Sequence, residues 1–207
     1  MSTVLLHPSY FPDLAHFVAM LQYDAIIFEV CDNYQKQTYR NRTSIYGANG
    51  KLDLNIPVIH TQKNRQLFKD VEIFTSEDWQ QQHLKSIESA YKNSPFFEFY
   101  IDDLIHLFQE PQTNLMDFNL KCLSSIFECF NLKFNYSFSS EYQINPVDET
   151  DGRSLVNAKR KIHQDFDRYA QVFEQKHGFL SNLSILDLLF NQGPSSEIYL
   201  KAQYLNI

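Results

Sequence analysis

The sequence predicts an α/β fold, with a mostly parallel sheet from the N-terminal half of the chain and a helical C-terminal half. Two observations support this prediction. The first thirty residues show strand, helix and strand patterns in succession, which typically form a pair of parallel strands. From residue 76 onward, apolar residues recur at helical spacing. We expect one domain over residues 1–207, with 1–75 as its α/β portion and 76–207 as its mainly helical portion.

The first predicted unit is a strand, a helix and a second strand. Residues 4–6 are a short apolar run that predicts a buried strand, and the proline-containing turn at residues 7–12 ends it. A helix is expected to begin at Pro12 or Asp13, because the apolar residues that follow lie on one helical face. Residues 25–30 predict the second strand.

Further strands are predicted before residue 76. A tight turn at residues 47–50 precedes residues 52–58, which alternate with the period of two that is typical of a half-buried strand. Pro57 ends that strand, because proline cannot donate to a strand ladder. Residues 69–73 predict another strand, so the middle of the chain is expected to be a sheet.

The C-terminal half is expected to be mainly helical. Thr75 or Ser76 would cap the first helix, which the Ser94-Pro95 pair breaks. The other predicted helices cover residues 96–108, residue 113 to about residue 131, and residues 183–190 before the stop pair Gly193-Pro194. Between them we predict a loop at 139–157, a short helix at 158–168 and a strand at 170–173.

Composition and charge exclude several classes of protein. The formal net charge of −7 and the isoelectric point near 5.4 argue against a nucleic-acid partner, because affinity for phosphates needs a basic face. No apolar run approaches the length of a membrane span, and the N-terminus lacks the cationic and apolar regions of a signal peptide. We therefore expect a cytoplasmic protein. The sequence leaves the cofactor and the oligomeric state open.

Familiar catalytic and metal-binding motifs are absent from the sequence. Cys31, Cys122 and Cys129 form no CxxC pair, and we interpret them as buried thiols. The seven histidines show no HxxxH or HExxH spacing, so no metal site is predicted. The GxSxG, P-loop and GxGxxG motifs are also missing.

The densest polar feature is the cationic block, residues 33–42. It carries Lys36, Arg40 and Arg42 without one acid, interleaved with tyrosines, glutamines and asparagines. Arginine binds carboxylate or phosphate through paired donors, and lysine binds them as a point charge. The block therefore predicts a site for a small anionic or sugar-containing ligand, with a solvated strand or loop rim as the alternative. We interpret the other basic cluster, at residues 153–161, as a solvated helix face.

Three titratable residues follow the first two predicted strands. His7 comes after the first, and Glu29 and Asp32 come at the end of the second. Ligands of open α/β sheets bind outside the carboxyl ends of the strands, so these side chains are the candidate catalytic residues. A bond to a turn carbonyl is the alternative for His7. Ion pairing with Lys36 or Arg40 is the alternative for the two acids.

These features predict one polar pocket at the edge of the first two strands. His7 would act as acid or base or bind phosphate, and Lys36 with Arg42 would hold the anion. Tyr39 would supply a stacking face, and Asn41 would bind hydroxyl groups. The full predicted lining is His7, Tyr10, Glu29, Asp32, Tyr34, Lys36, Tyr39, Asn41 and Arg42.

Predicted helices supply three further ligand-binding candidates. Trp79 and His83 lie one turn apart on the same face and would frame a ligand or form the edge of the core. Asp187 lies in a largely apolar helix and needs a partner, because an unpaired buried charge is costly. Backbone N–H groups or a nearby arginine would supply that partner. Alternatively, Asp187 would close the far wall of the pocket by pairing with Arg40 or Arg42.

Several stretches together carry a resemblance to a known family. They are His7-Pro8-Ser9-Tyr10-Phe11-Pro12, Asn33 through Arg42, Gly47-Ala48-Asn49-Gly50-Lys51-Leu52, Asn55-Ile56-Pro57-Val58, Asp78-Trp79, His83-Leu84-Lys85-Ser86-Ile87, Ala90-Tyr91, Ser94-Pro95-Phe96-Phe97 and residues 182–194. On these stretches the chain resembles the WbqC-like protein family, in particular the branch seen in Bacteroidetes-type bacteria. The resemblance covers most of the chain except roughly residues 110–165. Other branches carry an Asp-Asp pair after the second strand, where this chain has Glu29 and Asp32.

The resemblance implies an enzyme of bacterial surface-polysaccharide biosynthesis that acts on a nucleotide-linked or activated sugar. Acyl or aminoacyl transfer to a sugar amine is consistent with that context. A nucleotidyl-transfer enzyme is one alternative, because the first unit loosely resembles the HxGH adenylyltransferases, with Tyr10 where their second histidine would fall. A non-catalytic binding or scaffold protein is the other. Deep burial of the cationic block beside His7 would favour an enzyme, and a flat exposed placement would favour the scaffold.

Overall fold

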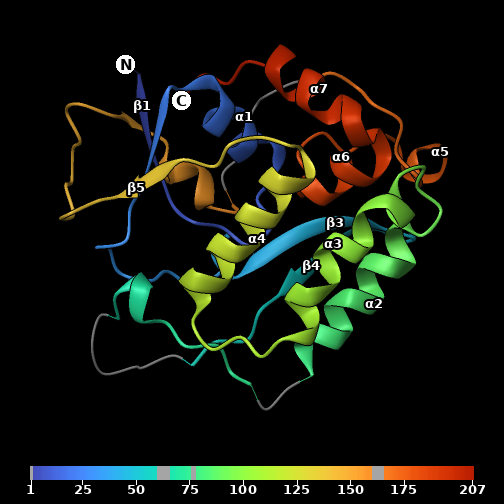
Figure 1. Cartoon of the computed structure of the whole chain (residues 1–207), viewed down its shortest axis with the longest axis horizontal. Helices are drawn as coiled ribbons and strands as arrows, with labels where there is room; N and C mark the ends of the chain where they lie inside the picture. The colour runs from blue at the N-terminus through green and yellow to red at the C-terminus, as the bar shows by residue number, and fades with distance from the viewer. Residues whose placement is uncertain (1, 60–65, 76–77, 160–165) are drawn as a thin grey trace.

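The computed structural model describes residues 2–59, 66–75, 78–159 and 166–207, and it confirms the predicted α/β fold (Figure 1). A parallel sheet has the strand order β5-β2-β1-β6. Its strands are β1 (Thr3–Leu6), β2 (Ala25–Phe28), β5 (Tyr136–Phe138) and β6 (Thr150–Asp151). The predicted βαβ unit is present, because helix α1 (Leu14–Gln22) joins β1 to β2.

The two faces of the sheet have different surroundings. On one face, Val4 and Leu6 of β1 and Ile26 and Phe28 of β2 enter the hydrophobic core. The side chain of Leu5, between Val4 and Leu6, points to the opposite face of the sheet, and Leu5 pairs in register with Ile27 of β2. This second face is covered by the segment that joins β5 to β6, which runs at the left of Figure 1. The carboxyl ends of the parallel strands meet at one edge of the sheet.

One edge strand, β6, comes from a part of the chain where the sequence predicted a loop. Residues 139–157 contain β6 and a 3-10 helix, η2 (Arg153–Val156). A two-residue strand carries no detectable periodicity, so its pairing with β1 is decided by tertiary contacts. Gly152 makes the close approach possible, because a Cβ atom there would lie 2.6 Å from a methyl carbon of Leu6.

The middle of the chain forms a separate hairpin rather than more of the parallel sheet. Strands β3 (Arg42–Gly47) and β4 (Gly50–Asn55) pair antiparallel, and Gly50 has a positive φ of 101° in their turn. The predicted strand at 69–73 is wrong. That segment begins in a 3-10 helix, η1 (Phe68–Asp70), and then makes single bridges from Glu72 and Ile73.

The helices of the C-terminal half agree with most of the predicted segments. They are α2 (Trp79–Tyr91), α3 (Phe97–Gln109), α4 (Leu115–Cys129), α5 (Glu174–His177), α6 (Ile185–Gln192), η3 (Gly193–Ser195) and α7 (Ser196–Ala202). Asn114 rather than Thr113 caps α4, because its side chain accepts a hydrogen bond from the backbone of Asp117. None of the helices in the described residues is long and apolar enough to cross a membrane.

The remaining predictions have mixed outcomes. Asp78 is the N-cap residue of α2, and Ser76 lies outside the described residues. Residues 170–173 do not form the predicted strand, and most of the helix predicted at 158–168 lies outside the described residues. The three thiols are free, with Cys122 buried and the other two half-buried.

We predict that Gly193→Ala destabilises the fold more than Gly178→Ala. Both glycines have positive φ values, of 50° and 79°, so alanine adds backbone strain at either position. A Cβ atom at Gly193 would also lie 2.5 Å from the ring of Phe96, whereas one at Gly178 meets nothing within 4 Å. At Gly193, the overpacking lowers the free energy of unfolding by a further ~1–3 kcal/mol. Equal losses of unfolding free energy for the two variants in urea would show that the Phe96 contact is unimportant.

Candidate functional site

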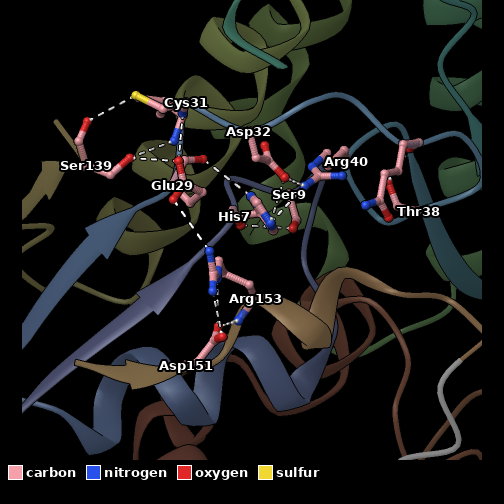
Figure 2. Close-up of polar contacts among 12 residues, drawn as sticks. His7, Ser9, Glu29, Cys31, Asp32, Thr38, Arg40, Ser139, Asp151 and Arg153 are labelled. Carbon is pink, nitrogen blue, oxygen red and sulfur yellow. Dashed lines mark hydrogen bonds and ion pairs between the residues drawn. The ribbon is translucent and has the colours of Figure 1, made fainter. Parts of the chain in front are cut away.

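Parallel pairing brings the loops after β1 and β2 together at the carboxyl edge of the sheet. Leu6 and Phe28 are partners at the end of the pairing, so His7 and Glu29 follow at the same level. The backbone N–H of Glu29 donates to the carbonyl of Leu6 at 2.8 Å. His7 Nδ1 lies 3.3 Å from the carbonyl of Glu29 (Figure 2). The two candidate catalytic residues are therefore neighbours.

His7, Asp32 and Arg40 form a buried polar cluster beside this edge. Arg40 Nη2 donates to His7 Nε2 at 2.7 Å and to Asp32 Oδ2 at 2.5 Å. The Arg40 guanidinium lies over the ring of Phe68, with its central carbon 5.2 Å from the ring centroid. Asn119 of α4 donates to the Arg40 carbonyl at 2.7 Å and so fixes the backbone. Part of the cationic block is thus buried beside His7.

The contacts of His7 identify its protonation state. A guanidinium can only donate, so His7 Nε2 must accept, and the ring proton lies on Nδ1 facing the Glu29 carbonyl. Burial lowers the pKa of His7 well below its usual value, and the charge of Arg40 lowers it further. His7 is therefore neutral at neutral pH. It is also a weak base, because the lone pair on its Nε2 atom already accepts a hydrogen bond from Arg40.

Asp32 and Arg40 each keep hydrogen-bonding capacity that the cluster does not use. Burial raises the pKa of the Asp32 carboxyl to about 6, although the charge of Arg40 acts in the opposite direction. Burial lowers the pKa of Arg40, and the charge of Asp32 offsets part of that effect. Among the described residues, Asp32 Oδ1 and the Nε and Nη1 groups of Arg40 have no hydrogen-bond partner.

Glu29 is a buried acid whose two carboxylate oxygens have different partners. Its side chain is 1% exposed, and Oε1 accepts from the backbone N–H of Cys31 at 2.7 Å and from Ser139 Oγ at 2.9 Å. Within the described residues Oε2 accepts no hydrogen bond, and it lies 3.8 Å from Nη1 of Arg153. One carboxylate oxygen is therefore held by two hydrogen bonds, while the other has only the Arg153 guanidinium near it.

Glu29 lines a pocket of about 140 Å³, which we call the Glu29 pocket. Leu5 and Ile27 form part of its floor on the sheet face away from the core. The segment from β5 to β6 supplies most of its wall, with Ser139, Ser140, Glu141, Gln143 and Glu149 as the polar members. Three of the lining residues are therefore acids, and the ten residues include no arginine or lysine.

Arg153 anchors the wall of the Glu29 pocket. Its guanidinium donates to both oxygens of Asp151, in each case at 2.8 Å. It also donates to the carbonyls of Gln143 and Ile144, at 2.7 and 3.1 Å, and lies over the ring of Tyr142. The interpretation of this arginine as part of a solvated face is wrong, because its side chain is 10% exposed.

Arg40, Ser139 and Arg153 are not part of the pocket lining predicted from the sequence. Arg40 belongs to the cationic block, but the predicted anion-binding residues are its neighbours Lys36 and Arg42. The structure places Lys36 in solvent and buries Arg40. Ser139 and Arg153 reach the site through the pairing of β5 and β6, which has no local signal in the sequence.

Tyr10, Trp79 and His83 form an aromatic cluster in the core. The Tyr10 hydroxyl and His83 Nδ1 are 2.9 Å apart, and the rings of Trp79 and His83 meet edge to face at 5.2 Å. Burial lowers the pKa of His83 to about 4. All three side chains are at most 5% exposed, which agrees with the core alternative for Trp79 and His83.

The remaining residues of the cationic block have separate positions. Tyr34 is buried, and burial raises its pKa to about 12, although the charges of Arg40 and Arg42 act in the opposite direction. Tyr39 meets the ring of His16 edge to face at 6.2 Å. The Asn41 side chain donates to the carbonyl of Ile56 at 3.0 Å. Arg42 begins β3, pairs across the hairpin with Asn55 and is half-buried.

The partners of Asp187 differ from those the sequence predicted. Its Oδ2 atom accepts from the Tyr169 hydroxyl at 2.6 Å and from the Gln171 amide at 2.7 Å. The predicted pairing with Arg40 or Arg42 is wrong, because Arg40 bonds to Asp32 and His7, and the described residues show no ion pair between Asp187 and Arg42. Burial raises the pKa of Asp187 to about 6, against the effect of hydrogen bonds with Tyr169, Gln171 and Tyr91.

Comparison with known proteins identifies relatives of the chain. The model of the WbqC-like protein family matches residues 7–165, a range that contains His7, Glu29, Arg40 and Arg153. The uncharacterised protein Rv1507c of Mycobacterium tuberculosis is 24% identical over an alignment of 223 positions. The alignment covers 95% of this chain and 96% of the relative. No solved structure gives a significant match.

We predict that Arg40→Met lowers the free energy of unfolding by about 3–5 kcal/mol, because it leaves the buried Asp32 carboxylate without its cation. Adding Asp32→Asn should recover part of the loss, since no buried charge then remains. Lys36→Met, an exposed change in the same block, is the control and should alter stability by at most about 0.5 kcal/mol. Urea unfolding measures all three. A double variant less stable than Arg40→Met would contradict the prediction.

We predict that Asp187→Asn gains stability relative to the parent as the pH rises from 4 to 7. The folded protein holds the Asp187 proton more tightly than the unfolded chain does, so ionisation above a pKa of about 6 destabilises only the parent. The raised pKa corresponds to a difference of about 2 kcal/mol across this range.

Comparing variant with parent is essential for this measurement. The lowered pKa values of His7 and His83 act in the opposite direction, because the unfolded chain takes up their protons first as the pH falls. That contribution is common to both proteins and cancels in the difference. Parallel stability profiles for Asp187→Asn and the parent would contradict the prediction.

Proposed function

The chain belongs to the WbqC-like protein family, and on that basis we propose that it is an enzyme of bacterial surface-polysaccharide biosynthesis. In this proposal it transfers an acyl or aminoacyl group to the amine of a nucleotide-linked or otherwise activated sugar. The observation that carries the proposal is the Oε2 atom of Glu29, a buried carboxylate oxygen that accepts no hydrogen bond within the described residues and belongs to a residue that lines a pocket. The burial of Arg40 beside His7 also favours an enzyme over a flat scaffold surface.

The chemistry of the Glu29 pocket favours an amine over an anion. Glu29, Glu141 and Glu149 line it, and a phosphate or carboxylate would be repelled by the same charges that attract an ammonium group. Hydroxyls of Ser139 and Ser140 and the amide of Gln143 suit sugar hydroxyls. The anionic ligand expected from the sequence therefore fits this pocket less well than a sugar amine does.

The size of the pocket limits what it holds. A cavity of about 150 Å³ accommodates one six-membered ring, and drug-sized ligands need about 300–1,000 Å³. At about 140 Å³, the Glu29 pocket would hold the amine-bearing edge of a sugar ring rather than the whole sugar. The nucleotide of an activated sugar would lie outside it.

Glu29 is assigned the proton transfer. Its Oε2 atom would first take a proton from the bound ammonium group, so that the neutral nitrogen can attack the carbonyl carbon of an activated acyl donor. The new C–N bond forms and the bond from the carbonyl carbon to the leaving group breaks. The nitrogen loses two protons in all, of which one passes to the leaving group and the other to solvent. Ser139 and the N–H of Cys31 occupy Oε1, so Oε2 is the oxygen left for the amine.

His7, Asp32 and Arg40 are assigned a positioning role in this proposal. The Nδ1–H group of His7 holds the carbonyl of Glu29, and Arg40 fixes the ring from its other side. A neutral histidine with a lowered pKa and an occupied Nε2 is a poor general base at neutral pH. For the nucleotidyl-transfer alternative, Tyr10 lies in the core with His83 and supplies no second group beside His7.

We predict that Glu29→Gln abolishes both amine selectivity and group transfer. The parent should bind glucosamine more tightly than glucose or N-acetylglucosamine, because only the first carries a positive charge. Saturation at a hundred times the dissociation constant should add about 2.7 kcal/mol of stability in thermal unfolding. Transfer from acyl-CoA or aminoacyl donors to a nucleotide-linked amino sugar, followed by mass spectrometry, should fall by about a hundredfold or more in the variant.

Glu110→Gln is the matched control, because Glu110 is an exposed acid that does not line the pocket. It should bind and transfer like the parent. Full transfer by Glu29→Gln would remove Glu29 from the chemistry. Binding without transfer from any donor would favour the scaffold alternative.

A further inference from the structure

A second, larger pocket lies between the β3–β4 turn and helix α2, far along the hairpin from the carboxyl edge of the sheet. Its volume is about 360 Å³, within the range of about 300–1,000 Å³ that ligand sites occupy. The turn residues 47–52 form one wall, and Lys85, Ser86, Ser89 and Ala90 of α2 form the other. We call it the hairpin pocket. It shares no residue with the Glu29 pocket.

The hairpin pocket is cationic in an acidic protein. The chain has 25 acidic and 18 basic residues, yet the lining of this pocket includes Lys51 and Lys85 and no aspartate or glutamate. A third lysine lies beside the pocket, because Lys176 Nζ donates at 2.9 Å to the carbonyl of Ala48, which lines the pocket. His177 Nε2 lies at the same distance from that carbonyl. The local charge is therefore opposite to that of the Glu29 pocket.

The backbone around the hairpin pocket is well fixed. Gly50 closes the turn with a φ of 101° that suits glycine, and α2 packs against β3 (Figure 1). The Tyr46 hydroxyl donates to the carbonyl of Gly178 at 2.6 Å and so ties the end of α5 to the hairpin. The lysines thus extend from elements whose relative positions are set by packing and hydrogen bonds.

One side of the hairpin pocket is apolar. Leu52 is 41% exposed and lines the pocket together with Ala90. An exposed leucine beside two lysines suits a ligand that has both a ring and a charged group. The serine hydroxyls of α2 add donors for oxygen atoms.

We propose that the hairpin pocket binds a diphosphate group attached to a ring, as in a nucleoside diphosphate. Lys51 and Lys85 contact the phosphates from opposite walls, since lysine binds phosphate as a point charge. Leu52 covers one face of the ring. This site is independent of the proposed transfer at Glu29 and adds a second ligand of opposite charge.

Calorimetric titration of the whole chain with inorganic pyrophosphate, UDP and uridine tests the proposal. UDP should bind most tightly, pyrophosphate less tightly and uridine least, and the affinity for pyrophosphate should fall as salt is added. Lys51→Gln and Lys85→Gln should each weaken pyrophosphate binding by about fivefold, and the double variant by about twentyfold. Lys85→Arg keeps the charge and should retain most of the affinity. Leu52→Ser should reduce the advantage of UDP over pyrophosphate.

Lys92→Gln is the control, because Lys92 is an exposed lysine at the end of the same helix and does not line the pocket. It should bind pyrophosphate like the parent. Failure of both pyrophosphate and UDP to bind below about 10 mM would overturn the proposal, as would parent-like affinity in the double variant. Equal affinity for UDP and pyrophosphate would overturn the assignment of the ring to Leu52. None of these outcomes affects the Glu29 proposal.

Discussion

The buried contact of Arg40 with Asp32 and His7 is the constraint on which the site depends. A guanidinium that is 1% exposed must have an anion close to it, because burying an unpaired charge is costly. Asp32 supplies that anion from the loop after β2, and His7 supplies an acceptor from the turn after β1. One arginine therefore holds two sheet-edge loops and the cationic block together. The Glu29 backbone is held in turn through His7 Nδ1.

Parallel strands explain why polar groups gather at this place. Each strand ends at the same edge, so the residues that follow β1, β2 and β5 are brought close together although they are far apart in sequence. The segment after β5 then folds over the face of the sheet opposite the core and is anchored by Arg153. This arrangement places Glu29 at a small acidic pocket, with one of its oxygens without a hydrogen bond in the described part of the chain. The cationic hairpin pocket lies on another part of the chain, so the two sites differ in both place and charge.

Several ionisable groups are kept in the interior at a cost. Burial raises the pKa values of Asp32 and Asp187 and lowers those of His7 and His83. Asp187 links α6 to the segment containing Tyr169 and Gln171, and its hydrogen bonds offset only part of the cost of burying a carboxylate. Its network serves the packing of the C-terminal segment, whereas the cluster around Arg40 serves the edge of the sheet. The two buried acids therefore organise different parts of the fold.

Elements with local signals could be predicted from the amino-acid sequence. The βαβ unit, helices α2 to α4 and α6, and the adjacency of His7 and Glu29 all follow from apolar periodicity and from the direction of parallel strands. The tertiary structure decided the rest. Strands β5 and β6 are too short to carry a period, and they exist because β2 and β1 offer them edges. Which arginine of the cationic block is buried, and which partners Asp187 finds, depends on contacts between residues distant in sequence. Such contacts leave no periodic trace, so composition and spacing could not tell which arginine of the block is buried.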